Sequence, residues 1–286
     1  MQIFNNFDLT KYNSYRIQAR CKMAYFPTCE EDFVEIYSKH NKNEIVTLGG
    51  GWNVILSRDY YDKVFVIIGE SFSNIEKIGK NMLECEAGVD TKKFSEFALR
   101  HALSGVEIYY DIPSSIGGAV VMNAGTKEME IKDILVKVRY LDLTEMQIKE
   151  IDKEDIGFEY RNSFFQKNTD KIVLKAWFKL NEGNSAAIHQ KMENVKQKRW
   201  AKQPKKFPNA GSVFKRPPGK FVGPMIDELG LKGYTIGGAQ ISEKHSGFIV
   251  NFSEATGEDI LAIISEVKQR VHKRFGVDLE VEQRVI

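Results

Sequence analysis

The sequence has few cysteines and histidines, and their spacing excludes two classes of site. The 286 residues include three cysteines, Cys21, Cys29 and Cys85, and none form a C-x-x-C pair. An odd number at this spacing argues against a disulfide framework and against a zinc site, so we expect buried, reduced thiols. The five histidines form no H-E-x-x-H motif and no cluster. We therefore expect no bound metal.

Long apolar runs and a large charge excess are also missing. No segment has the roughly 20 uninterrupted apolar residues of a membrane span, and residues 1–10 are too polar for a signal peptide. We expect a cytoplasmic protein without membrane insertion. The net charge is only +2, so affinity for anions has to come from local clusters, and we expect no nucleic-acid partner.

What is present is a mixed pattern of helical and strand periodicities in an ordinary globular composition, 42% hydrophobic and 28% charged. The apolar spacing predicts helices over residues 32–40, 91–103, 187–201 and 257–275. Alternation and short apolar runs predict strands over residues 45–48, 54–56, 64–68, 135–141, 172–180 and 277–286. The chain is therefore expected to be α+β, with a composition change near residues 181–184.

Two loops rich in small residues are candidates for ligand binding. A glycine loop, Gly49-Gly50-Gly51-Trp52-Asn53, follows a predicted strand. The chain then returns to strand and lacks the third glycine of the G-x-G-x-x-G motif, which disfavours a dinucleotide-binding site. The loop is either a plain turn or a set of backbone amides facing an anion. Residues 111–125 are too apolar for a linker, and form either a tightly packed buried loop or a backbone that lies against a large ligand. Two such loops favour an extended cofactor.

Three polar features remain. Arg161 lies among aromatic residues, and it is either a structural ion-pair partner or a fork for a substrate carboxylate. The stretch 208–217 presents Ser212 after a glycine and before Lys215 and Arg216, and it is either a surface loop or a site that faces an anion. The basic run 196–206 is either a solvated face or a local partner for a diphosphate.

Six separated segments, taken in order, resemble the UDP-N-acetylenolpyruvoylglucosamine reductase family, and together they span nearly the whole chain. The segments are L-G-G-G-W-N (48–53), I-P-S-S-I-G-G-A-V-V-M-N-A-G (112–125), Y-R-N-S (160–163), N-A-G-S-V-F-K-R-P (209–217), L-K-G-Y-T-I-G-G-A-Q-I-S-E-K-H-S-G-F-I-V-N (231–251) and L-E-V-E-Q-R (279–284). The sequence departs from the usual family pattern at Trp52 and Ser114, beside the expected flavin.

The resemblance implies an α+β fold in which a two-part FAD-binding region of the vanillyl-alcohol-oxidase type, residues 1–70 and 71–183, precedes a UDP-sugar-binding domain, residues 184–286. It implies tightly bound FAD and NADPH as co-substrate. The reaction implied is reduction of the enolpyruvyl group of UDP-N-acetylglucosamine enolpyruvate to UDP-N-acetylmuramate, for peptidoglycan synthesis. We expect a monomer of the shorter subclass, without a substrate-capping tyrosine loop. The alternatives are another FAD oxidoreductase of this fold and an inactive UDP-sugar-binding homologue.

The same resemblance assigns roles to individual residues. Arg161 and Glu282 would flank the enolpyruvyl carboxylate, and Ser212 would supply the proton. Glu282 would either hold Arg161 or hydrogen-bond the enol while protonated. The expected flavin contacts are Gly49, Gly50, Gly51, Asn53, Pro113, Ser115, Ile116, Gly118, Ala119 and Asn123. The expected contacts of the UDP-sugar are Lys202, Lys215, Arg216 and Lys232.

Overall fold

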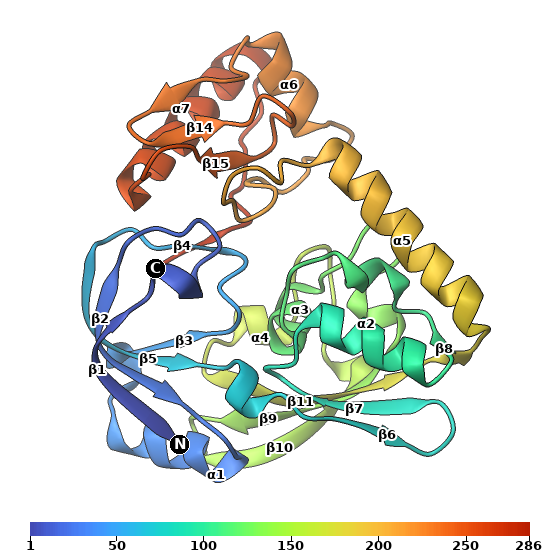
Figure 1. Cartoon of the computed structure of the whole chain (residues 1–286). Coiled ribbons are helices and arrows are strands. Elements are labelled where there is room, and N and C mark those ends of the chain that lie inside the picture. The colour runs from blue at the N-terminus through green and yellow to red at the C-terminus, as the bar shows by residue number, and fades with distance from the viewer. The chain divides into compact units, whose positions relative to one another are not determined.

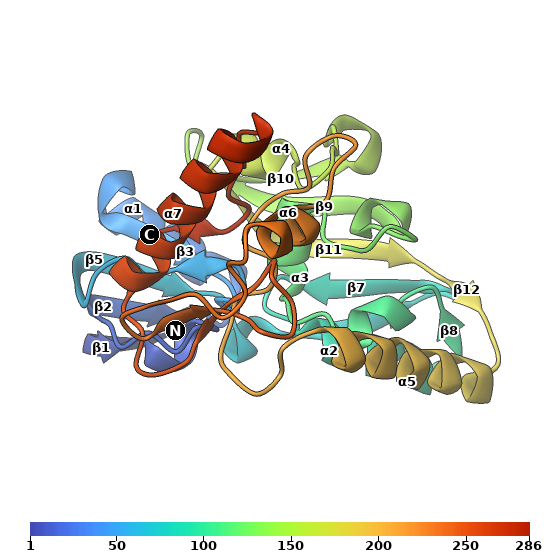
Figure 2. The same ribbon diagram turned by 90° about the horizontal axis from the view of Figure 1, so that it is seen from above.

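The computed structural model describes all residues, 1–286, and the chain divides into two compact units (Figures 1 and 2). Unit 1 comprises Met1–Asn5, Met23–Gly50 and Lys63–Arg199, and unit 2 comprises Asn6–Lys22, Gly51–Asp62 and Trp200–Ile286. The chain passes between the units inside the glycine loop, since Gly50 ends one segment of unit 1 and Gly51 begins a segment of unit 2.

The centre of unit 1 is a five-stranded antiparallel sheet of order β10-β9-β11-β7-β6. Its strands are β6 (Ile75–Ile78), β7 (Met82–Glu86), β9 (Leu135–Asp142), β10 (Gln147–Asp152) and β11 (Lys171–Lys179). Helices α2 (Thr91–Arg100) and α3 (Ile116–Met122) lie over the same face of this sheet (Figure 1). Phe94 and Ala98 of α2 are fully buried in the core there, so apolar burial fixes both helices on the sheet.

Helix α3 corrects the expectation of a non-helical loop over residues 111–125. Ser115 caps the helix, since its hydroxyl accepts a hydrogen bond from Gly118 N at 3.3 Å, and the helix ends at Asn123 with a left-handed φ of 45°. Gly117 permits close packing on the turn that follows β7, because a Cβ there would lie 2.9 Å from the Ala87 Cβ. Helix propensity is low in a Gly-Gly sequence, and the cap with tertiary packing overrides it.

A second sheet has the order β1-β2-β5-β3, formed by β1 (Gln2–Asp8), β2 (Arg20–Phe26), β5 (Tyr60–Ile67) and β3 (Ile45–Leu48). Strands β3 and β5 are parallel. Helix α1 (Glu30–Lys39) buries Phe33, Ile36 and Tyr37 in the core of unit 1. Helix α5 (Ser185–Lys202) buries only Ile188 and Met192, so most of its surface is solvated. The remaining short elements of unit 1 are α4 (Phe164–Lys167), β8 (Leu103–Ser104) and β12 (Asn181–Glu182).

Unit 2 is built around helix α7 (Gly257–Phe275), which packs on the sheet β13-β14-β15. These strands are Thr235–Ile236, Ala239–Ile241 and Ile249–Asn251. A capping box between Thr256 and Asp259 begins α7, and Gly276 ends it with a φ of 62°. Helix α6 is Val222–Glu228, and strand β16 (Arg284–Val285) pairs in parallel with β4 (Val54–Ile55).

The long helices and most strands agree with the prediction, and α7 has the predicted bounds. The expected strand over residues 277–286 is wrong, since only β16 and an isolated bridge between Val281 and Phe214 form there. The cysteines are free thiols, but Cys29 is exposed rather than buried. None of the helices combines the length and the apolar character needed to cross a membrane.

Candidate functional site

The first glycine loop and the start of α3 lie against each other inside unit 1. A Cβ added to Gly49 would be 2.8 Å from the Ser115 Oγ, so a larger residue at position 49 would displace the Ser115 hydroxyl. Ser115 is nearly buried and also forms an isolated antiparallel bridge with Asp90. Residues from the two small-residue loops are therefore brought together, as a single extended ligand would require.

The amides at the start of α3 are used within the protein. Ile116 N donates to Val89 O at 2.8 Å, Gly117 N donates to Ala87 O at 2.8 Å, and Gly118 N donates to the Ser115 hydroxyl. A ligand at this end would therefore be held by the shape of the glycine-rich surface and by the hydrogen of the Ser115 hydroxyl. The helix also has too few turns for its dipole to dominate. The outer residues Gly50 and Pro113 are exposed and open to a flat cofactor, whereas Ile116 and Ala119 are fully buried in the core.

Arg161 lies at the tip of a tight turn and caps the other end of α3. Its backbone has a left-handed φ of 53°. Its guanidinium donates from Nη2 to Gly125 O at 2.8 Å and from Nη1 to Asn123 O at 3.3 Å. Both acceptors are backbone carbonyls at or just after Asn123, the residue that ends α3, and a charged donor makes such hydrogen bonds stronger. The side chain is 18% exposed, so α3 positions a largely buried positive charge.

A buried amide supports that turn. Asn123 is fully buried, and its Nδ2 donates to Glu130 Oε2 and to Glu159 O, both at 3.0 Å. Both amide hydrogens are thus used inside unit 1. The Arg161 guanidinium lies 3.9 Å from Glu130, and the Tyr109 hydroxyl donates to Ala124 O at 3.0 Å. Burial raises the pKa of Tyr109 well above its ordinary value, so this donor stays protonated.

Ser212 and Glu282 are brought together in unit 2. Gly211 has a left-handed φ of 80°, and Ser212 then forms an antiparallel bridge with Phe248. The next residue accepts a hydrogen bond at its carbonyl, Val213 O, from Glu282 N at 2.8 Å. The two proposed catalytic residues therefore lie on adjacent extended segments, and Ser212 is exposed.

Asn53 also reaches this region. Its Nδ2 donates to Glu282 O at 3.1 Å, and its own carbonyl accepts from Arg284 N at 2.9 Å. An expected flavin contact and an expected catalytic residue are thus directly linked inside unit 2. Arg161 belongs to unit 1, whereas Ser212 and Glu282 belong to unit 2.

Sequence reasoning missed two buried polar residues behind Ser212. The Tyr15 hydroxyl donates to Gln283 Oε1 at 2.9 Å, and Gln283 Nε2 donates to Ala210 O at 3.1 Å. Burial raises the pKa of Tyr15 far above its ordinary value. Nothing in the sequence marks this pair, because a lone glutamine beside a charged segment has no periodic signal.

The predicted cations of the UDP-sugar site all lie in unit 2. Lys215 Nζ is 2.7 Å from Glu280 Oε1, and the Arg216 guanidinium lies over the Phe221 ring at 4.7 Å. Lys232 Nζ is 3.6 Å from Asp227 Oδ1, which also accepts a hydrogen bond from Ser246. Lys202 is exposed at the end of α5.

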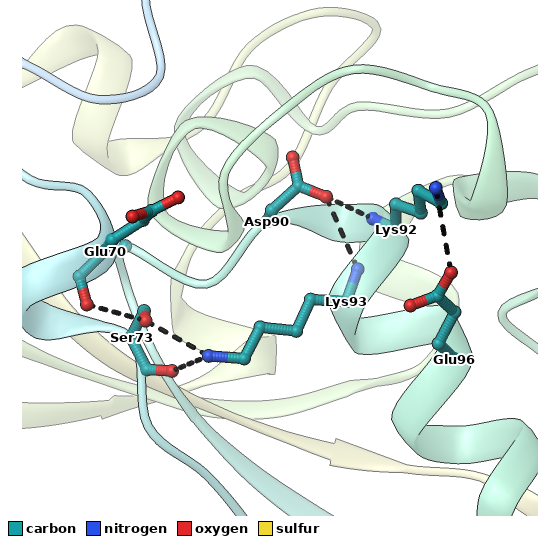
Figure 3. Close-up of a pocket in the computed structure, with 7 residues that line it drawn as sticks. Glu70, Ser73, Asp90, Lys92, Lys93 and Glu96 are labelled. Atoms are coloured by element: carbon teal, nitrogen blue, oxygen red, sulfur yellow. Dashed lines mark hydrogen bonds and ion pairs between the residues drawn. The ribbon is translucent and has the colours of Figure 1, made fainter.

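A separate polar pocket of about 480 Å³ lies beside the start of α2 in unit 1 (Figure 3). Its charged groups are mostly held by neutral partners: the Asp90 carboxylate accepts from the backbone N–H groups of Lys92 and Lys93, Lys93 Nζ donates to Ser73 O, and only Lys92 forms an ion pair, with Glu96. Its lining residues are Glu70, Ser73, Gly88, Asp90, Lys92, Lys93 and Glu96. Apart from its bridge with Ser115, Asp90 has no link to the predicted site residues, and the pocket supplies none of them.

Comparison with known proteins places these features in one family. The model of the C-terminal domain of UDP-N-acetylenolpyruvoylglucosamine reductase matches residues 203–286, and a model described as an FAD binding domain matches residues 22–149. The reductase of Francisella tularensis is 42% identical over 97% of this chain and 98% of that protein. The reductase of Fusobacterium nucleatum is 37% identical over 99% of this chain and 98% of that protein.

A solved structure agrees with the sequence comparison. The crystal structure of the Thermus caldophilus reductase has a TM-score of 0.81 and 30% sequence identity, and the match covers 99% of this chain and 98% of that one. The predicted fold class, an FAD-binding region with a C-terminal α+β domain, is confirmed.

Proposed function

The chain belongs to the UDP-N-acetylenolpyruvoylglucosamine reductase family, and from this membership we propose how its own residues serve the reaction. The protein is an FAD-dependent, NADPH-using oxidoreductase that reduces the enolpyruvyl group of UDP-N-acetylglucosamine enolpyruvate to UDP-N-acetylmuramate, a peptidoglycan precursor. The observation that carries this conclusion is the 42% identity over 97% of the chain.

The residues that would hold FAD are the expected contacts of the two glycine-rich loops, with Gly49 and Ser115 at their meeting point. Bound FAD supplies the hydride, which it takes from NADPH. The chain supplies close backbone approach through Gly49 and Gly50 and a hydroxyl through Ser115. The expected contact of Asn123 with the cofactor stays a prediction, since this residue is fully buried and its amide hydrogens already serve Glu130 and Glu159.

Arg161 would bind the enolpyruvyl carboxylate. Hydride addition to the alkene moves negative charge into an enolate of that carboxylate, and a fixed cation stabilises this charge as it develops. Five N–H donors allow one guanidinium to cap a helix and bind a carboxylate at the same time. The fixed carbonyl partners Asn123 and Gly125 would hold the cation in place before the substrate arrives.

Ser212 would deliver the proton to the enolate carbon. Serine is a weak acid, but an enolate is basic enough to take its proton when the hydroxyl is held in place. The turn at Gly211 presents the hydroxyl, and the adjacent segment presents Glu282. Glu282 would hydrogen-bond the carboxylate end of the substrate in its protonated form, or stay ionised and pair with a cation.

The predicted cations would bind the diphosphate, since Lys202, Lys215, Arg216 and Lys232 offer charge-assisted donors. We also place the enzyme in the cytoplasm as a monomer. The division into two FAD-binding parts, 1–70 and 71–183, and a UDP-sugar part, 184–286, stays a prediction.

The test is Ser212→Ala in the FAD-loaded enzyme, measured one half-reaction at a time. NADPH should bleach the flavin at the rate of the unsubstituted protein. Recovery of flavin absorbance on adding the enolpyruvyl substrate should slow by about 10²–10⁴-fold, the usual contribution of a general acid. A loss under about tenfold refutes Ser212 as the proton donor. An unsubstituted protein that takes up no FAD would instead favour an inactive UDP-sugar-binding protein.

A further inference from the structure

The Tyr15–Gln283 pair touches three carbonyl groups around Ser212. Gln283 Nε2 lies 3.1 Å from Ala210 O, 3.4 Å from Gly211 O and 3.5 Å from Ser212 O. The Gln283 side-chain oxygen is occupied by the Tyr15 hydroxyl at 2.9 Å. One amide thus spans both peptide groups that flank Gly211, the residue whose left-handed backbone turns the chain toward Ser212.

Both members of the pair are locked in place. Tyr15 is 0% exposed and Gln283 is 4% exposed. The Tyr15 carbonyl accepts a hydrogen bond from Asn251 Nδ2 at 2.8 Å. A buried amide with its donors and acceptor satisfied is costly to displace, since an unsatisfied polar group in the interior costs about 1–3 kcal/mol.

The pair also connects to the second half of the glycine loop within unit 2. Ser14, the neighbour of Tyr15, donates from its backbone N to Gly51 O at 3.0 Å and from its hydroxyl to Trp52 O at 3.3 Å. Asn53 of that loop donates to the Glu282 carbonyl. Two routes of hydrogen bonds therefore run from residues 51–53 to the segment that bears Ser212 and Glu282.

We propose that Gln283, held by Tyr15, is a positioning residue that sets the orientation of the Ser212 hydroxyl for proton delivery. The proposal rests on the role of Ser212 proposed above. Gln283 does not touch the reacting atoms. It acts on Ser212 through the backbone, because its amide contacts the carbonyls of Ala210, Gly211 and Ser212.

The test uses Gln283→Met, which keeps the length of the side chain and removes its hydrogen bonds, in the FAD-loaded full-length enzyme. Reduction of the flavin by NADPH should stay within about twofold of the unsubstituted rate, while reoxidation by the enolpyruvyl substrate should slow by about 10–100-fold, as expected of a misplaced reactive group. The KM for that substrate should change by less than about threefold, because binding groups are unaltered.

A double mutant separates positioning from general damage. If Gln283 acts through Ser212, Gln283→Met added to Ser212→Ala should slow reoxidation by no more than about twofold further. Multiplication of the two losses would overturn the proposal, and so would a Gln283→Met variant with reoxidation within about threefold of normal. If Ser212→Ala alone has no effect, both proposals fail; if only Gln283→Met has none, this one fails alone.

Tyr15→Phe keeps the test decisive if Gln283→Met does not fold. It removes only the hydroxyl that orients the amide, and we expect reoxidation to slow by about 3–10-fold with NADPH reduction unchanged. Tyr61→Phe is the matched control: its hydroxyl, also buried in unit 2, donates to Ile286 O at 2.7 Å. Equal losses in the two tyrosine variants would overturn the proposal.

Discussion

Arg161→Lys should separate the structural role of Arg161 from the catalytic role proposed for it. Lysine keeps the positive charge. The free-energy cost of the left-handed backbone is also unchanged, because both residues carry a Cβ. It loses the planar fork that reaches Asn123 O at 3.3 Å and Gly125 O at 2.8 Å together. The substitution therefore removes the two-point contact with the carbonyls and keeps the positive charge.

The expected loss of stability follows from those two contacts. A hydrogen bond to a charged group contributes about 1.5–3 kcal/mol, and an ammonium can keep one of the two carbonyl partners. With a side chain that is 18% exposed, we expect a loss of about 1–2 kcal/mol in the free energy of unfolding. That corresponds to a fall of about 2–8 °C in Tm for a protein of this size.

The expected kinetic loss is larger and confined to one half-reaction. Removing a preorganised donor for developing negative charge costs about 10²–10³-fold in rate. Stopped-flow absorbance should show normal bleaching by NADPH and slow recovery with the enolpyruvyl substrate. Arg139→Lys is the control, since Arg139 pairs with Glu150 at 2.9 Å and Glu30 at 3.4 Å on the sheet. Recovery within about threefold of normal in Arg161→Lys would leave Arg161 only its structural role.

Two further predictions concern stability. Gly51→Ala should lower the free energy of unfolding by more than about 2 kcal/mol and weaken FAD retention, because the added Cβ would lie 2.0 Å from Tyr12 O. The control is Gly79→Ala, since Gly79 has the same φ of 69° and no atom within 4 Å of an added Cβ. Equal losses of stability in denaturant for the two variants would contradict the reasoning. Burial lowers the pKa of His245 below 6.5, with Asp227 opposing and Lys232 adding to the shift. As the pH falls, the unfolded chain binds the proton of His245 before the folded protein does, so stability should fall as the pH drops through about 6.5. The measurement is Tm against pH for His245→Gln and for the unsubstituted protein. Parallel curves would refute the prediction.

The long helices were predictable because the apolar spacing and the capping residues of each helix lie within one segment of the sequence. Helix α7 has apolar residues at helical spacing, the Thr256 cap and the terminal Gly276, and its predicted bounds are correct. The strand expected over residues 277–286 failed for the opposite reason. Leu279 is buried and Glu280 is exposed, as alternation suggests, but a strand also needs a partner along its length. The available partners are short: Phe214 at one bridge and β4 at two residues.

The site was predictable only in part. The family motifs single out Ser212 and Arg161 as candidates, and the local sequence predicts a turn at Ser212, whereas the turn at Arg161 is seen only in the structure. Spacing does not reveal what holds those turns, because Tyr15 and Gln283 are 268 residues apart in the chain. Helix α3 was missed because Gly117 and Gly118 lower helix propensity. Ser115 before the pair and Asn123 after it are recognisable capping residues, and they were the available signal.

In both units, a residue with a left-handed backbone lies at or next to a proposed site residue, and a buried side-chain amide holds the turn. Arg161 itself has a left-handed backbone, and Ser212 directly follows a left-handed glycine. This conformation costs of order 1–3 kcal/mol at Arg161, where the surroundings have to fix it, and little at Gly211, which has no side chain. In each unit the fixing group is a buried primary amide that donates to backbone carbonyls of the turn: Asn123 to Glu159 O in unit 1, and Gln283 to Ala210 O in unit 2. An amide can satisfy two donors and an acceptor without adding charge, so it holds a turn without altering the electrostatics of the Arg161 cation or the acidity of the Ser212 hydroxyl. An ionised carboxylate in either position has no N–H to donate, so it would hold none of these carbonyls, and it would add a negative charge beside the proposed site.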